Sequence, residues 1–502
     1  MEDSVNLSTS MCDVESSLLN HNVSFNSTMV MSSADVSLPK LSVTLSEAEI
    51  LKLQLQKQVG EGCVSLDVSA PMESSLQESS TQDNKVEEDS GRIIDIEDTL
   101  NNTQDVTSAQ EPSEAASFDY FQNGLVELGR RYWTSSVEAQ HYTKGCYWSP
   151  DGTCLLVPVH LDGMHVLELP TDLYSAPTVQ KSRVLTKLQS AVHVPEGGTV
   201  YDCVWFPQMN SQQPDSCFWL ATRQHEPIHM WDAFDGTLRC SYSGYDAVDE
   251  VMAAISLAFS HDGQKIYAGY KRCIKIFDTS RPGRLCDDYP VKFAISCIAQ
   301  TSEHPNTLTC GNWHGYIQHF DLRCNPKQGL LFTLGGHKSG ITQLRYGGEG
   351  HGNWHLFSGA RKCGKILQWD MRNYKKPLAE FQRHVDTNQR IQFDITSDRR
   401  WLTSGDTRGS LNVWDLHGEG EASVLPIHSD CCNGVALNPL MPVLATSSGQ
   451  YHFTGPNAHG DNVTWNGSVA TEEVSPETNP PETEVVYENA VIMWWSDSIS
   501  PH

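Results

Sequence analysis

The sequence has no run of apolar residues that approaches the roughly 18 needed for a helix to span a bilayer. It begins Met-Glu-Asp-Ser, without the basic residues and the apolar stretch of a secretory signal. These two absences argue against a membrane anchor and against export. We therefore expect a protein of the cell interior that has no membrane partner.

Signatures of catalysis are also missing. The sequence contains no GxxxxGKS/T phosphate loop, no GxSxG nucleophile elbow and no HExxH zinc motif. Its 15 cysteines include no CxxC pair and many lie in strand-like stretches, which predicts buried, reduced thiols. Cys310 and His314 have loose ligand spacing, but no second pair accompanies them. We therefore expect no enzyme, no cofactor and no metal site.

The first 117 residues have little that could build a core. They contain no Trp and a single Phe, and they carry 21 acidic residues against 5 basic ones. Such a segment cannot bury enough apolar surface to offset its ordering entropy, so we predict that 1–117 is disordered. A capping box, Ser46-Glu-Ala-Glu49, precedes Ile50 and Leu51. It indicates either a short helix that folds on a partner or transient helicity without a role.

Acidic charge is concentrated outside the predicted core. The chain has a formal net charge of −27, of which 1–117 carry −16. Residues 454–488 add seven acids and no base, whereas 118–453 hold 33 acids and 30 bases. The sequence therefore predicts an acidic tail, an acidic disordered insertion over 454–487, and a folded body that is close to neutral.

What the sequence does contain is a repeat of one short phrase: an aliphatic residue, two spacers, a bulky hydrophobic residue and an acid. From Asp232 to Asp415 the acids lie 46, 43, 49 and 45 residues apart. A period of about 40–45 residues that ends in Trp-Asp is typical of WD repeats, each of which forms one four-stranded blade of a β-propeller. The copies are GMHVLEL (163–169), PIHMWDA (227–233), CIKIFDT (273–279), YIQHFDL (316–322), KILQWDM (365–371), SLNVWDL (410–416) and the degenerate AVIMWWS (490–496).

Seven copies predict an all-β fold, a seven-bladed WD-repeat β-propeller over 118–502. Closing the ring requires a strand from near 121–135 to complete the last blade. Two insertions interrupt the period, one of about 20 residues between blades 1 and 2, near 170–199, and the other over 454–487. The predicted structural residues of the repeat are Trp231, Asp232, Phe277, Asp278, Phe320, Asp321, His337, Trp369, Asp370, Trp414 and Asp415.

The turns between strands b and c lack their usual residue. In typical WD repeats an Asp seven residues before the Trp lies in this turn and bonds a His from a Gly-His pair. Only His337, with Ser358 and Trp369, keeps part of that network. Counting back seven in blades 1–6 gives His160, Gln224, Tyr270, Trp313, Lys362 and Thr407, none of which is Asp.

Cationic and aromatic residues surround these turns. The b–c and d–a connections share one face of a propeller, so the pattern predicts a rim of Arg and Lys with an exposed Trp and Tyr, Trp313 and Tyr270. RNA phosphates would meet the cations, and splayed bases would stack on the aromatics. The pattern alone leaves RNA, protein and other ligands open. The candidate contacts are Arg223, His225, Lys271, Arg272, Trp313, His314, Arg361, Lys362, Arg390 and Arg408.

A protein-only scaffold is the alternative. Phe320-Asp321-Leu322-Arg323 and Trp369-Asp370-Met371-Arg372 fit the WDxR box of substrate receptors in cullin ubiquitin ligases. That box is short and is also common in ordinary blades.

Strings outside the generic repeat resemble the telomerase Cajal body protein family. The resemblance runs from about 145 to 495 and includes the interrupted last blade. The strings are EPIHMWDAFDGTLR (226–239), AISLAFSHDGQKIYAGYKRCIKIFDTSRPGR (254–284), LGGHKSGIT (334–342), LFSGARKCGKILQWDMR (356–372), TNQRIQFDITSD (387–398), NGVALNPLMPVLATSSGQ (433–450) and VIMWW (491–495).

The resemblance implies a non-enzymatic RNA-binding scaffold. Members of this family recognise the Cajal-body box in hairpin loops of H/ACA-type small Cajal-body RNAs, and deliver these RNAs and telomerase RNA to Cajal bodies. The implied partners are these RNAs, ribonucleoprotein core proteins and other nuclear proteins, with no DNA bound directly. The implied location is the nucleus and its Cajal bodies, with room for a cytoplasmic pool. The tail and the insertion carry no matching strings, and no strong basic import signal is present.

Overall fold

The structure is a computed structural model that describes residues 118–121, 124–135, 139–174, 176–347, 354–418, 421–453 and 487–500. The predictions of disorder for 1–117 and the insertion, and of a helix after Ser46, lie outside these residues. The boundary predicted between 117 and 118 stays a prediction. Over the described residues the chain is almost entirely β, with only two short 3-10 helices, η1 (Thr171–Leu173) and η2 (Pro214–Ser216). None of its described helices is long and apolar enough to cross a membrane.

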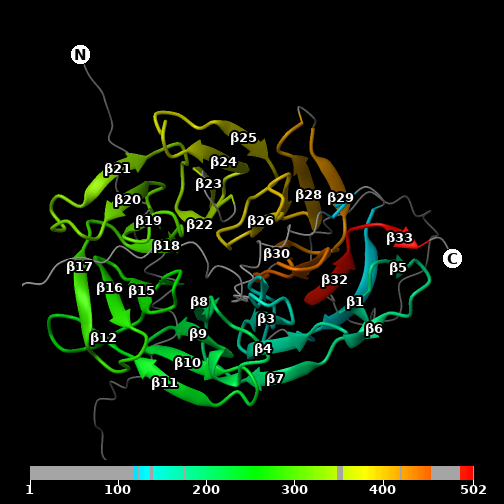
Figure 1. Cartoon of the computed structure of the whole chain (residues 1–502), viewed down its shortest axis with the longest axis horizontal. Helices are drawn as coiled ribbons and strands as arrows, with labels where there is room; N and C mark the ends of the chain where they lie inside the picture. The colour runs from blue at the N-terminus through cyan, green and yellow to red at the C-terminus, as the bar shows by residue number, and fades with distance from the viewer. Residues whose placement is uncertain are drawn as a thin grey trace, which may run out of the picture. The chain divides into compact units, whose positions relative to one another are not determined.

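Seven antiparallel sheets surround a central axis, as the repeat predicts (Figure 1). The first three blades follow one another along the chain. Blade 1 holds β2 (Tyr147–Trp148), β3 (Cys154–Val159), β4 (Gly163–Glu168) and β7 (Ser190–Val194); blade 2 holds β8 (Val200–Trp205), β9 (Phe218–Arg223), β10 (Ile228–Asp232) and β11 (Leu238–Tyr242); blade 3 holds β14 (Ser256–Phe259), β15 (Lys265–Gly269), β16 (Cys273–Asp278) and β17 (Cys286–Pro290).

The remaining blades repeat this order. Blade 4 holds β18 (Ile295–Ala299), β19 (Thr307–Asn312), β20 (Ile317–Asp321) and β21 (Leu330–Leu334); blade 5 holds β22 (Ile341–Tyr346), β23 (His355–Ala360), β24 (Lys365–Asp370) and β25 (Ala379–Gln382); blade 6 holds β26 (Phe393–Ile395), β27 (Trp401–Gly405), β28 (Ser410–Asp415) and β29 (Ser423–Pro426); blade 7 holds β30 (Cys432–Leu437), β31 (Val443–Ser448), β32 (Ala490–Trp495) and β1 (Val126–Tyr132). A small hairpin, β12 (Gly244–Tyr245) with β13 (Val251–Met252), joins blades 2 and 3.

The bulky residue of each repeated phrase fills the interface with the preceding blade. It lies on the third strand of its own blade, and it is buried in blades 1 and 3–6 and partly buried in blades 2 and 7, where it is Trp231 and Trp494. Its neighbours in the apolar clusters come from the blade before it, so each blade covers the next. The pairs are Phe277 with Phe218, Phe320 with Tyr267, Trp369 with Ile317, and Trp414 with Phe357.

The acid of each phrase starts the turn between strands c and d. One carboxylate oxygen accepts the backbone N–H two residues later, at distances of 2.8–3.0 Å in all five turns from Asp232 to Asp415. This is an Asx-turn, which a carboxylate stabilises without any other partner. The phrase therefore combines an interface residue with a turn residue. The accepting acids are Asp232, Asp278, Asp321, Asp370 and Asp415.

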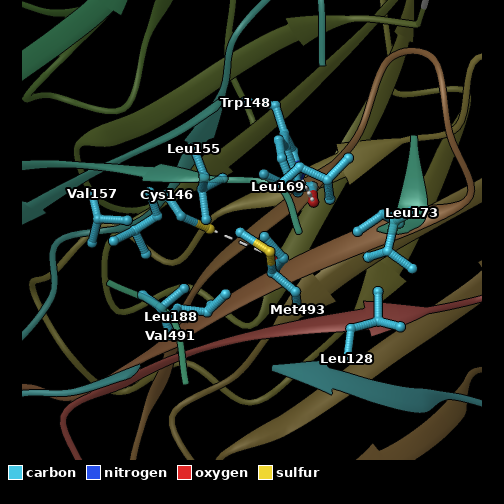
Figure 2. Packing of buried hydrophobic residues seen from close by; sticks show 14 of the residues in the cluster. Leu128, Cys146, Trp148, Leu155, Val157, Leu169, Leu173, Leu188, Val491 and Met493 are labelled. Carbon is cyan, nitrogen blue, oxygen red and sulfur yellow. Dashed lines mark hydrogen bonds between the residues drawn. The ribbon is translucent and has the colours of Figure 1, made fainter. Parts of the chain in front are cut away.

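The ring closes as predicted, by pairing the first strand with the last blade. β1 runs antiparallel to β32, with Arg130 opposite Ile492. Figure 2 shows Leu128 of β1 beside Met493 of β32, packed with Leu155 and other residues of blade 1. The same apolar cluster thus joins blade 7 to blade 1.

The first insertion belongs to blade 1 rather than lying between blades 1 and 2. It forms the connection between β4 and β7, whereas β7 itself completes the blade. In this connection β6 (Thr186–Lys187) pairs in parallel with β1, and β5 (Val179–Gln180) pairs with β33 (Ile499–Ser500). The sequence count could not distinguish a long c–d connection from a long link between blades.

Candidate nucleic-acid interface

The b–c and d–a connections form one face, which we call the b–c face. Contacts between the two kinds of connection occur in blade after blade. The backbone N–H of Arg361 donates to Gly340 O at 3.0 Å, and the backbone N–H of Thr407 donates to His384 O at 3.0 Å. The predicted sharing of one face by these connections is therefore correct.

Two blades keep a Trp-hydroxyl-His network beneath this face. In blade 5, Trp369 Nε1 donates to Ser358 Oγ at 2.9 Å, and His337 Nε2 lies 2.9 Å from the same oxygen. The other ring nitrogen of His337 lies 3.4 Å from Cys363 Sγ, so a thiol occupies the usual Asp position. That position is six residues before the Trp, so counting back seven missed it by one.

Blade 7 has a more complete network, which the sequence reasoning missed. Trp494 Nε1 donates to Thr446 Oγ1 at 2.8 Å, and His428 Nε2 lies 2.9 Å from that oxygen. The carboxylate of Glu488 accepts from His428 Nδ1 at 2.9 Å and also from Ser429. Glu488 is again six residues before the Trp. The long insertion separates it from β31, which concealed it in the sequence.

The b–c turn of blade 4 is built by a buried amide. Asn312 Oδ1 accepts the backbone N–H groups of His314 at 2.9 Å and Tyr316 at 3.2 Å. Gly315 completes the turn at φ 81°, where a Cβ would lie 2.8 Å from His337 O. The turn therefore holds Trp313, His314 and Tyr316 outward, and all three are exposed.

Trp313, His314 and Tyr316 form, together with Phe293 from the d–a connection before β18, what we call the aromatic platform. The ring centroids of Phe293 and His314 are 4.6 Å apart, and those of Phe293 and Tyr316 are 6.3 Å apart with planes inclined by 25°. Two cations flank these rings. Lys292 Nζ lies 5.1 Å from the Phe293 centroid, and Arg361 Cζ lies 5.9 Å from that of Trp313.

The sequence reasoning found only part of the platform. It named Trp313 and His314, but not Lys292, Phe293 or Tyr316. Phe293 lies in the d–a connection directly before β18, outside the b–c turns from which the candidates were counted. The prediction that Tyr270 is exposed on the rim is wrong, because its side chain is buried at 1% exposure. In blade 4, Tyr316 is exposed instead.

Five of the predicted cations and polar residues stand exposed on neighbouring b–c turns. Among the described residues, none of their side chains forms an ion pair. Lys362 is held at φ 46°, a conformation that L residues rarely adopt. These exposed residues are His225 in blade 2, Lys271 and Arg272 in blade 3, Lys362 in blade 5 and Arg408 in blade 6.

Arg223 and Arg390 are on this face but are held by acids. Arg223 Nε lies 2.9 Å from Oε2 of Glu196, which is 3% exposed and also accepts from a Trp. Arg390 Nη1 lies 3.1 Å from Asp202 Oδ1 and donates to Tyr147 Oη at 3.1 Å. Arg390 also lines a central cavity of about 280 Å³. The candidate interface requires guanidinium groups that are free to meet a ligand, whereas both of these are paired with acids.

A second group of aromatic rings lies on the connections of blades 1 and 7. The rings of Tyr142 and His160 stack with centroids 4.7 Å apart, and Tyr451 packs against Phe453 at 4.9 Å. Phe453 is 80% exposed and is the last described residue before the insertion. Phe453 and Tyr487 both lie in the connection between strands b and c of blade 7, that is, between β31 and β32.

Two other sequence patterns have local explanations. Arg323 and Arg372 of the WDxR boxes each fold back on the Asp two residues earlier, with pairs of bonds between 2.7 and 3.0 Å. Cys310 is buried in β19, whereas His314 points outward from the following turn, so the two do not form a site. All described cysteines are free thiols.

The fold defines a class of protein, the WD-repeat β-propeller. No protein-family model matches the chain. The chain is 73% identical over 500 residues to the telomerase Cajal body protein 1 homolog of Drosophila melanogaster, covering 99% of this chain and 92% of that relative.

Mammalian relatives are also similar. Identity is 36% over 424 residues with telomerase Cajal body protein 1 of Mesocricetus auratus, which covers 79% of this chain and 77% of the relative. It is 36% over 379 residues with the Homo sapiens protein of the same name, with coverage of 72% and 67%. The chain belongs to the telomerase Cajal body protein family.

Proposed function

We propose that this chain is a non-enzymatic RNA-binding scaffold. It recognises the Cajal-body box in hairpin loops of H/ACA-type small Cajal-body RNAs, and of telomerase RNA where that RNA is present. It directs these RNAs to Cajal bodies and so supports telomerase function and RNA modification. The names of its relatives, which refer to telomerase and to the Cajal body, support this reading.

The observation that carries the proposal is the aromatic platform with its flanking cations. Unpaired bases of a hairpin loop stack on aromatic side chains at about 1–3 kcal/mol per base, and the phosphates between them meet Lys and Arg. Lys271, Arg272 and Lys292 are exposed, and the backbone N–H of Val291 donates to Arg272 O at 2.9 Å, which brings this turn to the connection that carries Phe293. The body as a whole is nearly neutral, so affinity must come from such a local patch rather than from bulk charge.

The surroundings proposed for this scaffold follow from the same reading. It acts in the nucleus and its Cajal bodies, with ribonucleoprotein core proteins and other nuclear proteins as partners and with a cytoplasmic pool. The N-terminal segment, with its charge of −16, would repel stray nucleic acid and lower non-specific binding.

A gel-shift titration at fixed salt tests the proposal. The probe is a hairpin with the Cajal-body box in its loop, and the competitor is the same hairpin with a mutated loop. We expect the full chain to prefer the box, and Trp313→Ala to weaken binding by about 5- to 150-fold, the equivalent of one lost stacked base. Trp401→Ala removes a partly exposed Trp from the a–b turn region of blade 6 and is the matched control.

Two results would count against the proposal in different ways. Equal affinity for the two hairpins would remove the RNA assignment itself. Preserved discrimination with an unaffected Trp313→Ala variant would move the interface elsewhere on the propeller. A protein-only scaffold, such as a cullin ligase receptor, would instead keep its co-purifying partners after nuclease treatment and lose an adaptor in Arg372→Ala.

A further inference from the structure

A cluster of three metal-ligating side chains lies in blade 1, apart from the aromatic platform. Asp162 lies in the b–c turn, His165 follows on β4, and His193 is on the neighbouring β7. One ligand atom from each residue lies within 4.8 Å of those of the other two. We propose that these three side chains bind a divalent transition-metal ion of the zinc class.

The strand register brings the two imidazoles together. His165 and His193 lie directly opposite each other on adjacent antiparallel strands, the arrangement in which cross-strand side chains touch. Their rings stack with centroids 4.3 Å apart and planes inclined by 6°. Both Nε2 atoms face Asp162: that of His165 lies 2.9 Å from one carboxylate oxygen, and that of His193 lies 3.6 Å from the other.

The turn that carries Asp162 is held in an unusual conformation. Leu161, directly before it, has φ 60° and is 47% exposed, although a bulky L residue rarely adopts this region. A glycine or asparagine would fit such a position at lower cost. The strained turn points the Asp162 carboxylate back towards the two histidines rather than into solvent.

One imidazole is also oriented by a second contact. His165 Nδ1 lies 2.8 Å from Ser190 Oγ, the kind of outer hydrogen bond that fixes a ligating histidine.

The cluster is accessible to solvent on the side of His193 and Asp162. The side chains of His193 and Asp162 are 42% and 31% exposed, so water can complete the coordination. His193 Nε2 now donates to Asp162 O at 2.8 Å. Binding therefore moves that proton to Nδ1, and the Nε2 lone pair then faces the metal. Two imidazoles and one carboxylate suit zinc, nickel, cobalt or copper better than calcium or magnesium.

A nearby cation opposes metal binding. Arg131 lies on β1, close enough to Asp162 to interact with its charge, and its guanidinium lies 5.0 Å from the centroid of the Trp133 ring. Because like charges repel, replacing Arg131 by an uncharged residue should strengthen the binding of a metal ion. This consequence distinguishes a metal site from a plain hydrogen-bonded cluster.

Titration of the full chain with Zn²⁺ by calorimetry, under reducing conditions, tests the site. We expect one ion per chain, loss of that binding step in His193→Ala, and no change in His417→Ala, which removes an exposed histidine elsewhere. Ser190→Ala should weaken binding by about 10- to 100-fold, as the loss of an outer hydrogen bond does. Arg131→Gln should strengthen it.

Co²⁺ as a spectroscopic probe separates this site from the cysteines. Imidazole and carboxylate ligands give no thiolate charge-transfer band, whereas cysteine coordination does. The proposal is overturned if the wild-type chain binds no Zn²⁺, if His193→Ala binds as well as the wild type, or if the bound Co²⁺ shows thiolate bands. His193 is exposed, so its replacement leaves the blade intact and each of these results can be interpreted.

Discussion

Two sectors of the b–c face both carry cations on the connections between strands, but the cations of one sector are paired with acids and those of the other are not. In the paired sector, Arg223 and Arg390 are bound by Glu196 and Asp202. In the open sector, Lys271 and Arg272 have no acid at ion-pair distance among the described residues and stand near the aromatic platform. We therefore expect a cation on this face to be available to a ligand only where no carboxylate has already neutralised it.

The comparison also separates stability from binding. A partly buried ion pair stabilises the fold only while both members are present, because a buried carboxylate left alone is costly. An exposed lysine contributes little to stability but remains available to phosphate. Substitutions in the two sectors should therefore affect different measurements.

The largest effect is expected in the paired sector, from Arg390→Ala. It leaves Asp202, which is 8% exposed, without its partner across the central cavity. The free energy of unfolding should fall by about 3–5 kcal/mol, measured by chemical denaturation. RNA affinity of the folded variant should not change. Adding Asp202→Asn to this variant should recover much of the lost stability. If Arg390→Ala were instead stable but bound RNA more weakly, Arg390 would act as an RNA contact, like the cations of the open sector.

Reversing charge in the open sector should change salt dependence rather than stability. We expect Lys271→Glu with Arg272→Glu to reduce the slope of log affinity against log salt by about 1.4, or 0.7 for each lost phosphate contact. The matched control is Lys375→Glu with Lys376→Glu, which makes the same change of charge on the exposed c–d connection of blade 5. Equal effects of the two pairs would mean that bulk charge, not a site, attracts the RNA.

The ionised carboxylate of Glu488 in the blade 7 network should make the stability of the fold depend on pH in the acid range. Burial alone would raise the pKa of Glu488, but hydrogen bonds from His428 and Ser429 outweigh it and lower the pKa to about 2. A lowered pKa stabilises the fold above the ordinary value of 4.5, and this contribution is lost as pH falls towards 2. Solvent screening leaves about 1 kcal/mol of this effect. Unfolding of Glu488→Gln, followed between pH 5 and 2, should therefore depend less on pH than that of the wild type; identical profiles would contradict the pKa shift.

The smallest effect concerns strain in the open sector. Lys362 holds φ 46° without an ion pair to a described residue, whereas glycine adopts this region freely. Lys362→Gly should raise the free energy of unfolding by about 0.5–1 kcal/mol. This is the cost of holding an L residue in the left-handed region, reduced by the larger conformational entropy that glycine loses on folding. The same variant should bind the box hairpin more weakly. A gain in stability without a loss of binding would show that the strain has no link to RNA.

The sequence was a good guide to whatever is local along the chain. The repeated phrase located the c strands, because its bulky residue and its acid act within one interface and one turn, as Trp369 and Asp370 show. It also required the closing strand found at Val126–Tyr132. Both predictions depend on periodicity, which a single sequence displays directly.

Features that depend on distant partners could not be predicted in this way. Nothing in the sequence around Arg390 indicates Asp202, because the two are 188 residues apart and meet only across the closed ring. Phe293 joins the aromatic platform from a connection that carries no repeat signature. His428 and Glu488 form one network although an insertion separates them, so no spacing rule could identify the pair.

The pairing of β1 with β32 also determines how long β1 stays unpaired while the chain is synthesised. β1 leaves the ribosome early, but its partner is made almost a full propeller later, with Arg130 opposite Ile492. At about 5–20 residues per second, β1 must wait roughly 20–70 seconds with an unpaired edge. An exposed strand edge is a template for wrong pairing. Nascent chains of this protein therefore need protection over that interval, and a slow or stalled ribosome would lengthen the period of risk.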